Sequence, residues 1–274
     1  MSQSTLDALG LPLFVPGHRP DRYAKAAAAG ADAIIIDLKD AVPAEAKAEA
    51  RGALQCALAS AAFAVPVLVR VNAAGTPWHE ADLAVCAELP LAAIMLPKAE
   101  TATGVAHAAV KSGHPVLALI ETARGLRAID AITEAATRLA FGSIDYAADI
   151  GADHVRESLL FARSTLVVAA RAADRPPPLD GVTVAINDAE ALAGDCRHAR
   201  ALGMGGKLLI HPAQIPGARQ AFAPGAEEIA WARTILAATA SADGGVVKVD
   251  GAMVDPPVIK RAEQIMRRAE ADAK

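Results

Sequence analysis

The chain has 274 residues, with 27 Lys and Arg against 31 Asp and Glu, and only 3% of its residues are aromatic. The acidic balance and the scarcity of aromatic residues exclude the basic patches and stacking platforms of nucleic-acid-binding proteins. No stretch reaches the roughly 18 uncharged apolar residues of a membrane helix, and no basic segment precedes an apolar run at the N-terminus. Three widely spaced cysteines predict reduced packing residues in a cytoplasmic protein, not a disulfide framework.

Short apolar runs, many of them β-branched, alternate with longer amphipathic segments along the chain. Such runs are typical of parallel strands that are buried on both faces. The predicted strands are Leu11–Val15, Ala33–Asp37, Val65–Val71, Ala92–Leu96, Val116–Ile120, Leu139–Phe141, Gly181–Ile186 and Gly206–Ile210. The expected helices include Asp21–Ala29, Ala44–Ala62, Trp78–Leu89, Ala123–Ala136, Glu157–Ala173 and Asp188–Leu202.

Helix boundary signals agree with these segments. Thr101 and Asn187 are expected N-caps, Pro43 stands at an early helical position, and Gly30 and Gly203 follow helices. Strands that alternate with helices in this way predict an α/β protein built as a closed (β/α)8 TIM barrel. A doubly wound open sheet is the alternative, but no glycine-rich dinucleotide loop follows the first strand.

The pattern changes after the eighth predicted strand. Glu227–Ala240 is an expected helix, residues 244–254 are an expected hairpin with an Asp250-Gly251 turn, and Pro256–Ala273 is an expected final helix. We therefore divide the chain into a barrel domain, residues 1–222, and a helix–hairpin–helix extension, residues 223–274. A barrel does not need this extension, so we expect it to cover the barrel or to reach a neighbouring subunit.

Polar side chains stand where the apolar runs end, which is where barrels of this type collect their reactive groups. They are Asp37, Lys39, Asp40, Arg70, Asn72, Lys98, Glu121, Asp145, Lys207 and His211. A charge directly after a buried strand, such as Glu121, is costly unless it is paired or binds a metal. Two carboxylates from neighbouring strand ends, Glu121 and Asp145, suit Mg²⁺. The alternative is that they form salt bridges with Arg70 or Lys98, or cap a helix.

Cationic side chains near the predicted mouth are candidates for substrate binding. Arg70 lies within an apolar strand and can grip a carboxylate through two parallel hydrogen bonds, or can pair with Asp37 or Glu121. Arg19 follows the first strand and could hold phosphates, or could be a solvated charge that begins a helix. His211 precedes a proline and is more simply a structural histidine than a catalytic one.

Eight successive segments resemble the motifs of the citrate lyase beta-subunit-like family of the HpcH/HpaI aldolase superfamily. They are LFVPGHRPDR, ADAIIIDLKDAV, VLVRVN, AIMLPKAE, ALIETARG, LAFGSIDYAADIG, DGVTVAIND and GGKLLIHPAQI. The resemblance runs from about residue 11 to about residue 270. It implies a TIM barrel, a homo-oligomer (trimer or hexamer), and Mg²⁺ held by Glu121 and Asp145.

The resemblance also implies an activity. It implies a carbon–carbon lyase of retro-aldol or Claisen type that acts on malyl-, citramalyl- or citryl-coenzyme A, or on a related thioester, with Arg70 orienting the substrate. An acidic residue of the extension would reach a neighbouring active site, and DGAMVDPPVIKRA makes Asp255 that candidate. Asp37 or Asp255 would act as the general base, and Arg19, Lys39 and Lys98 are further substrate-binding candidates.

One position departs from the family pattern: DLKDAV carries Lys39 where the family has a glutamate. An ammonium there should weaken cation binding nearby, neutralise an acid, or serve as a second grip on an anion. Three alternative functions stay open at this point. They are an aldolase that acts on a free 2-oxo acid, an aldolase that uses Lys39, Lys98 or Lys207 as a Schiff-base nucleophile, and a non-catalytic binding protein.

Overall fold

The computed structural model describes residues 4–60, 62–240, 247–249 and 252–272. The chain forms two compact units, residues 1–218 and residues 219–274. Among the described residues, we find no helix with the length and apolar character required to span a bilayer.

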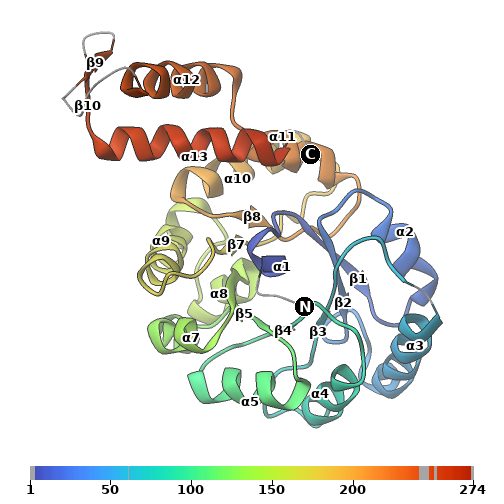
Figure 1. The fold of residues 1–274 in the computed structure, drawn as a ribbon. Helices are drawn as coiled ribbons and strands as arrows, with labels where there is room; N and C mark the ends of the chain where they lie inside the picture. The colour runs from blue at the N-terminus through green and yellow to red at the C-terminus, as the bar shows by residue number, and fades with distance from the viewer. Residues whose placement is uncertain (1–3, 61, 241–246, 250–251, 273–274) are drawn as a thin grey trace. The chain divides into compact units, whose positions relative to one another are not determined.

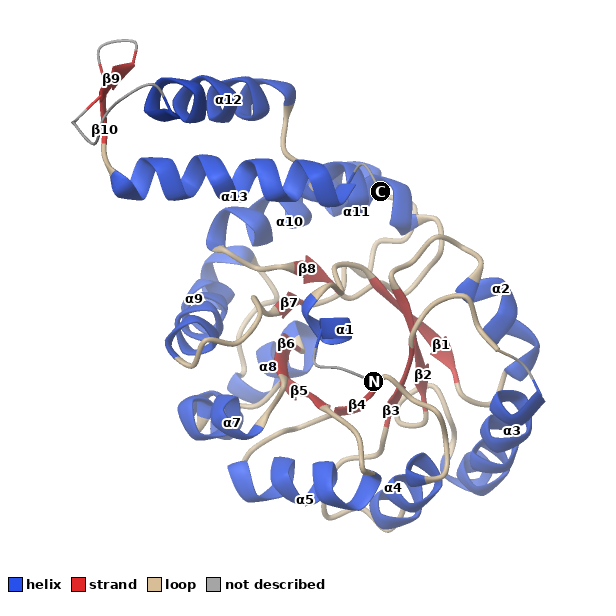
Figure 2. Ribbon diagram, in the orientation of Figure 1, coloured by secondary structure: helices blue, strands red, loops and turns tan. Residues whose placement is uncertain are grey.

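The first unit contains an eight-stranded parallel sheet in the order β1 to β8 (Figures 1 and 2). The strands are β1 Pro12–Pro16, β2 Ala33–Asp37, β3 Val67–Arg70, β4 Ala93–Leu96, β5 Val116–Ile120, β6 Arg138–Phe141, β7 Leu179–Asp180 and β8 Gly206–Lys207. A parallel bridge between Leu13 and Leu209 returns the sheet to its first strand. The predicted (β/α)8 barrel is therefore confirmed.

Helices form an outer ring around the strands (Figure 2). They are α2 Tyr23–Ala27, α3 Lys47–Ser60, α4 His79–Ala87, α5 Ala102–Ser112, α6 Ala123–Arg127, α7 Ile129–Ala135, α8 Ser143–Ile150, α9 Arg156–Ala172, α10 Ala189–Leu202 and α11 Gln214–Phe222, with 3₁₀ turns η1 Pro20–Arg22 and η2 Ala44–Ala46. The strands are almost wholly buried because one face meets these helices and the other meets the barrel interior.

The short helix α1, Ser4–Asp7, lies over the centre of the strand ring in Figure 1. Leu6 and Leu9 belong to the same apolar cluster as the strand residues. The buried guanidinium of Arg138 donates hydrogen bonds to the carbonyls of Leu6, Leu9 and Pro177, at 2.6, 2.5 and 2.8 Å. Burial lowers the pKa of Arg138 to about 10. The N-terminal segment is thus tied to the floor of the barrel.

The structure corrects the predicted seventh and eighth strands. β7 is Leu179–Asp180, so the segment predicted as a strand over Gly181–Ile186 is a loop. The carbonyls of Gly181 and Thr183 accept hydrogen bonds from the side chains of Lys207 and Gln214, which replace the backbone partners that a strand would need. β8 likewise ends at Lys207, well before the predicted end.

Three smaller predictions were also wrong. The helix predicted over residues 123–136 is broken at Ala128 into α6 and α7. Asp188, not Asn187, is the N-cap of α10, because its carboxylate accepts the amide of Ala191. Cys56 is exposed, so it does not pack in the core.

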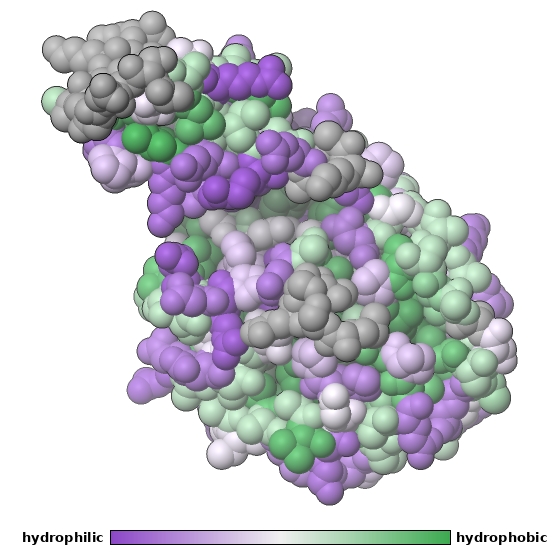
Figure 3. Space-filling model, in the orientation of Figure 1, coloured by the Kyte–Doolittle hydropathy of each residue, from purple (hydrophilic) through white to green (hydrophobic). Residues whose placement is uncertain are grey.

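The second unit contains α12 Ala226–Ala240, the antiparallel strands β9 Val247–Val249 and β10 Ala252–Val254, and α13 Pro256–Asp272. Its apolar cluster consists of Ala232, Ile235, Val254, Ala262 and Ile265. The visible side of α13 is largely hydrophilic in Figure 3, as expected for an amphipathic helix. The predicted Asp-Gly turn at residues 250–251 lies outside the described residues.

Candidate functional site

The polar strand-end residues gather at one end of the barrel because all eight strands are parallel. Asp37 ends β2, Arg70 ends β3, Glu121 directly follows β5, and Asp145 lies in the first turn of α8 after β6. Lys39 follows β2 and completes the group. The structure therefore brings together five of the residues that the sequence singled out.

Arg70 and Asp37 form a bidentate pair. They are register partners on adjacent strands, and Nε and Nη2 of Arg70 donate to the two carboxylate oxygens of Asp37, each at 2.7 Å. Asp37 also accepts the amides of Lys39 and Ala41. Burial alone would raise the pKa of Asp37, but the hydrogen bonds and charge of Arg70 outweigh it and hold that pKa below its usual value. Arg70 also stacks over the Phe14 ring, 4.7 Å from its centroid.

Glu121 is buried and only half satisfied. Its Oε1 accepts the ammonium of Lys39 at 3.1 Å and the amide of Lys98 at 3.0 Å. Its Oε2 is buried and has no hydrogen-bond partner among the described residues. Burial raises the pKa of Glu121, and the negative charge of Asp145 adds to that rise. A buried carboxylate oxygen without a partner is costly, so this atom marks a place for a ligand.

The Lys39 ammonium lies among three carboxylates. It is 3.1 Å from Glu121, 3.3 Å from Asp40 and 4.0 Å from Asp145. Burial alone would lower the pKa of Lys39, but the charges of Glu121 and Asp40 raise it above its usual value. The buried ammonium of Lys47 donates to the carbonyls of Leu38 and Lys39 and so fixes this turn. Of the outcomes expected for Lys39, the structure shows the one in which it pairs with nearby acids.

A cavity of about 490 Å³ opens beside these residues. Its charged lining residues are Asp37, Asp40, Arg70, Glu121 and Asp145. The remaining lining is mostly apolar, and comes from Phe14, Val15, Pro16, Ala41, Leu119, Phe141, Gly142, Ser143, Ile144, Val182, Leu208 and Ile210. A concave apolar pocket with a few convergent charges is the usual form of a small-molecule site.

Three other cationic residues singled out in the sequence lie outside the cavity lining. Arg19 is partly exposed and pairs with Asp21 in a bidentate contact. Lys98 presents its backbone amide to Glu121, while the residue itself is exposed and has a positive φ of 47°. Lys207 is buried, donates to Gly181 and lies 3.5 Å from Asp180. Among the described residues, the cavity lining includes none of the three candidate Schiff-base lysines.

Asp255 and His211 also have local partners. Asp255 is exposed in the second unit, where its Oδ1 accepts the amide of Val258 and caps α13. The amide of Ala213 donates to Nδ1 of His211, which is a local turn contact.

Two site residues escaped the sequence reasoning. Gly142 lies against Glu121: a Cβ at Gly142 would be 2.5 Å from Glu121 Cβ and 2.6 Å from Oε2. Ser143, which lines the cavity, makes a 2.9 Å hydrogen bond through its hydroxyl with Nε2 of His154. The Gly-Ser pair that directly follows a buried strand was the available signal, since a glycine there permits close approach of another residue.

Comparisons with known proteins identify the family of this chain. Residues 11–212 match the HpcH/HpaI aldolase/citrate lyase family. A citrate lyase subunit beta-like protein of Mycobacterium tuberculosis (strain CDC 1551 / Oshkosh) is 40% identical over 266 residues, covering 94% of each chain. A (3S)-malyl-CoA thioesterase of Cereibacter sphaeroides (strain KD131) is 36% identical over 271 residues, covering 95% of this chain and 94% of the relative.

The fold comparison gives the same result. The crystal structure of protein CitE from Mycobacterium tuberculosis, in complex with magnesium, acetoacetate and coenzyme A, has a TM-score of 0.86 and 39% identity, and covers 96% of this chain and 99% of CitE. The chain therefore belongs to the HpcH/HpaI aldolase/citrate lyase family, and is a carbon–carbon lyase of its citrate lyase beta-like, coenzyme A-ester type.

Proposed function

We propose that this protein is a Mg²⁺-dependent lyase that cleaves a hydroxy-dicarboxylic acyl thioester of coenzyme A, such as malyl-, citramalyl- or citryl-coenzyme A. The observation that carries the proposal is the buried, unpartnered Oε2 of Glu121 beside the cavity. Two similarities support parts of it: one relative is named a (3S)-malyl-CoA thioesterase, which supports a malyl thioester as the class of substrate, and the CitE structure contains magnesium, acetoacetate and coenzyme A.

The acidic residues fit a hard divalent cation. Glu121 offers a buried carboxylate oxygen without a partner, and the half-exposed carboxylate of Asp145 lies at the start of a helix nearby. Carboxylate oxygens completed by water are the usual ligands of Mg²⁺. When bound, Mg²⁺ would act as a Lewis acid that stabilises negative charge on substrate oxygens.

Arg70 has one arm free for the substrate. Its Nε and Nη2 are held by Asp37, and Nη2 also lies 3.1 Å from Asp40. Within the described part of the chain, its Nη1 makes no hydrogen bond. In our proposal Nη1 donates a hydrogen bond to the substrate oxygen that gains negative charge. A donor already held in place stabilises that charge in the transition state. Asp37 already accepts four hydrogen bonds and has a lowered pKa, so we assign it the positioning of Arg70.

Cleavage also needs a base. The base removes the hydroxyl proton, that carbon becomes a carbonyl as the carbon–carbon bond breaks, and the electron pair remains as an enolate on the thioester fragment. We keep Asp255 as the candidate, supplied by a neighbouring subunit of a homo-oligomer. Its Oδ2 makes no hydrogen bond among the described residues, and the side chain is exposed. Arg19 remains our candidate for contacts with the thioester carrier.

Lys39 adjusts the affinity of the metal site. Its ammonium already occupies the space between Glu121 and Asp145 that a cation would share. We propose that it stabilises Glu121 when no metal is bound, and that the ammonium would leave these oxygens when they hold Mg²⁺. Mg²⁺ affinity would then be set by competition between the metal and this ammonium for the same oxygens.

The test is cleavage of malyl-, citramalyl- and citryl-coenzyme A by the purified protein, with Mg²⁺ and with EDTA. We expect the carbon–carbon bond of one of these thioesters to be cleaved, at a rate that depends on Mg²⁺. Glu121→Gln keeps the shape of the side chain but removes its charge, and should abolish both turnover and Mg²⁺ binding. Cleavage that survives EDTA, or borohydride trapping of a lysine, would contradict the proposal in favour of Schiff-base chemistry. Cleavage of free 2-oxo acids alone would contradict the thioester assignment.

A further inference from the structure

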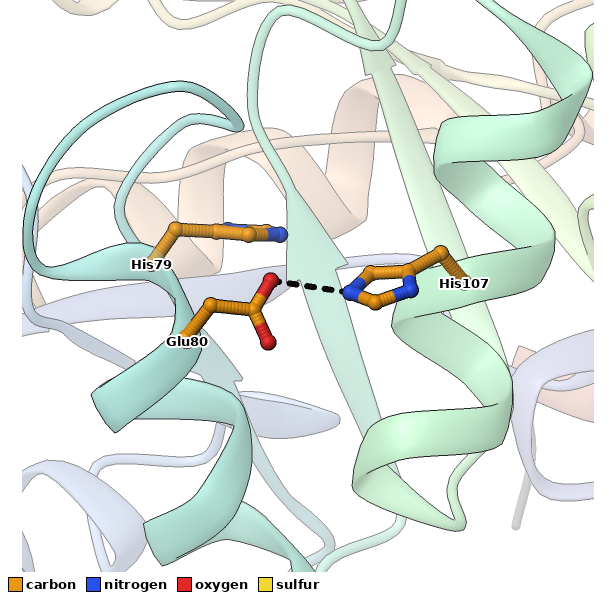
Figure 4. Close-up of side chains that lie close together, drawn as sticks. All are labelled: His79, Glu80 and His107. Carbon is orange, nitrogen blue, oxygen red and sulfur yellow. Dashed lines mark hydrogen bonds and ion pairs between the residues drawn. The ribbon is translucent and has the colours of Figure 1, made fainter.

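A second cluster of metal-ligating side chains lies on the outer ring of helices. His79 and Glu80 begin α4, and His107 lies on the neighbouring helix α5 (Figure 4). One ligand atom from each of the three residues lies within 4.8 Å of the other two. Figure 4 shows the His79 ring and the Glu80–His107 pair facing the same gap. We propose that these residues form a zinc site distinct from the carboxylates at the strand ends.

The first argument is the protonation of His79. Its Nδ1 lies 2.7 Å from the carbonyl oxygen of Asn72. Because a carbonyl oxygen can only accept a hydrogen bond, Nδ1 carries the proton, and Nε2 of the neutral ring has a free lone pair. A backbone carbonyl that fixes one ring nitrogen in this way is the usual outer partner of a metal-binding histidine. Nε2 makes no hydrogen bond to any other described residue.

Burial gives the second argument. His79 is only 4% exposed, so its imidazole is held in one orientation by its surroundings. An imidazole nitrogen that makes no hydrogen bond to the described residues is available to bind a cation. The rings of His79 and His107 are stacked with their centroids 6.4 Å apart, so the second imidazole is close at hand.

The third argument is the Glu80–His107 pair. His107 Nε2 lies 2.8 Å from Glu80 Oε1, so a proton is shared between them in a hydrogen bond. A metal would take the place of that proton. Ligand bonds of about 2.0–2.1 Å would set tetrahedral ligand atoms about 3.3 Å apart, so the Glu80–His107 contact must open slightly and both side chains must shift relative to His79. Glu80 and His107 can make this movement because their side chains are 64% and 44% exposed.

The ligand types select the metal. Two imidazoles and one carboxylate suit a borderline cation such as Zn²⁺, whereas Mg²⁺ prefers oxygen ligands alone. Three protein ligands leave one tetrahedral position for water. The bound metal would fasten α4 to α5 and hold His79 against Asn72, which follows β3 two residues after Arg70.

Calorimetric titration with Zn²⁺ tests the proposal, using the whole protein after removal of metals and in the presence of excess Mg²⁺ to occupy the strand-end carboxylates. We expect one Zn²⁺ per chain and a rise in the unfolding temperature on binding. His107→Ala and Glu80→Ala change exposed side chains, so they should fold. Each should weaken Zn²⁺ binding at least about tenfold. His18→Ala, which removes an exposed histidine elsewhere, should bind Zn²⁺ as the wild type does.

Two results would overturn the inference. One is a wild-type protein that binds no Zn²⁺ at about 100 µM, well above the range of structural zinc sites. The other is a His107→Ala variant with unchanged affinity. X-ray absorption of the zinc-loaded protein adds a direct readout: it should detect two imidazole ligands in the wild type and one in His107→Ala.

Discussion

The ammonium of Lys39 lies 3.1 Å from the carboxylate of Glu121, although the two residues are 82 positions apart in the sequence. The pair forms where a divalent cation would bind in our proposal, and the Lys39 charge should oppose that binding. Lys39→Met should therefore bind Mg²⁺ at least about tenfold more tightly than the wild type, because a unit charge about 4 Å away is worth more than 1 kcal/mol in a partly buried site. Isothermal titration with Mg²⁺ measures the change.

Stability supplies the control for this prediction. Without metal, Lys39→Met leaves Glu121 without its charged partner and should unfold more easily, by about 3 kcal/mol. Added Mg²⁺ should then restore more stability to Lys39→Met than it adds to the wild type. Lys25→Met, at an exposed position on α2, should change neither property. Equal Mg²⁺ affinity in Lys39→Met and the wild type would show that the ammonium does not compete with the metal.

Gly142 provides a second test of the proposed metal site at Glu121. An added Cβ would lie 2.6 Å from Oε2 of Glu121, so Gly142→Ala must displace the carboxylate. We expect a loss of about 1–3 kcal/mol in stability from overpacking, together with weaker Mg²⁺ binding and slower turnover. The matched control is Gly52→Ala on α3, where nothing lies within 4 Å and alanine should stabilise the helix by about 0.5–1 kcal/mol. If Gly142→Ala binds Mg²⁺ as tightly as the wild type does, Glu121 is not a ligand of the metal.

Lys98 distinguishes a backbone role from a side-chain role. Its positive φ of 47° is strained for a residue with a Cβ, and its amide donates to Glu121. Lys98→Gly keeps the amide and relieves the strain, so the variant should gain about 1 kcal/mol and retain activity. Asp174→Gly, at a surface position with φ 50°, should gain less, because aspartate tolerates this conformation and its carboxylate contacts Arg171. If Lys98→Gly loses activity and Asp174→Gly does not, the ammonium of Lys98 takes part in binding or chemistry.

Acid stability reports on the Asp37–Arg70 pair. The folded-state pKa of Asp37 is lowered, so its contribution to stability is fully present above its unfolded pKa of about 4, and is lost as the pH falls through the folded value. In Arg70→Met, burial dominates and raises the pKa of Asp37, so stability should fall as the pH rises through about 4. Urea unfolding between about pH 3 and about pH 7 measures both slopes. Arg22→Met is an exposed control, and matching slopes in Arg70→Met and the wild type would refute the argument.

The barrel was predictable because its strands are buried on both faces and therefore appear as continuous apolar runs, as in Val116–Ile120. The seventh strand was not, because the apolar run that follows Gly181 gives no sign that its carbonyls bond to side chains of Lys207 and Gln214. Periodicity records burial, whereas strand pairing depends on partners that are remote in the sequence.

The candidate site was predictable in its membership but not in its pairings. Parallel topology alone brings Asp37, Arg70 and Glu121 to one end. The sequence left open whether Glu121 pairs with Arg70 or Lys98; in the structure Lys39 supplies the ammonium and Lys98 supplies only its amide. These pairings depend on side-chain rotamers and on the positive φ of Lys98. Neither feature produces a periodic pattern in the sequence.

The guanidinium of Arg138 holds three carbonyls at the floor of the barrel, opposite the end where the strand-end acids and Arg70 gather. The N-terminal ends of the strands therefore carry a structural anchor that takes no part in the candidate site. A change at the mouth, such as one at Lys39, would leave the contacts of Arg138 at the floor in place.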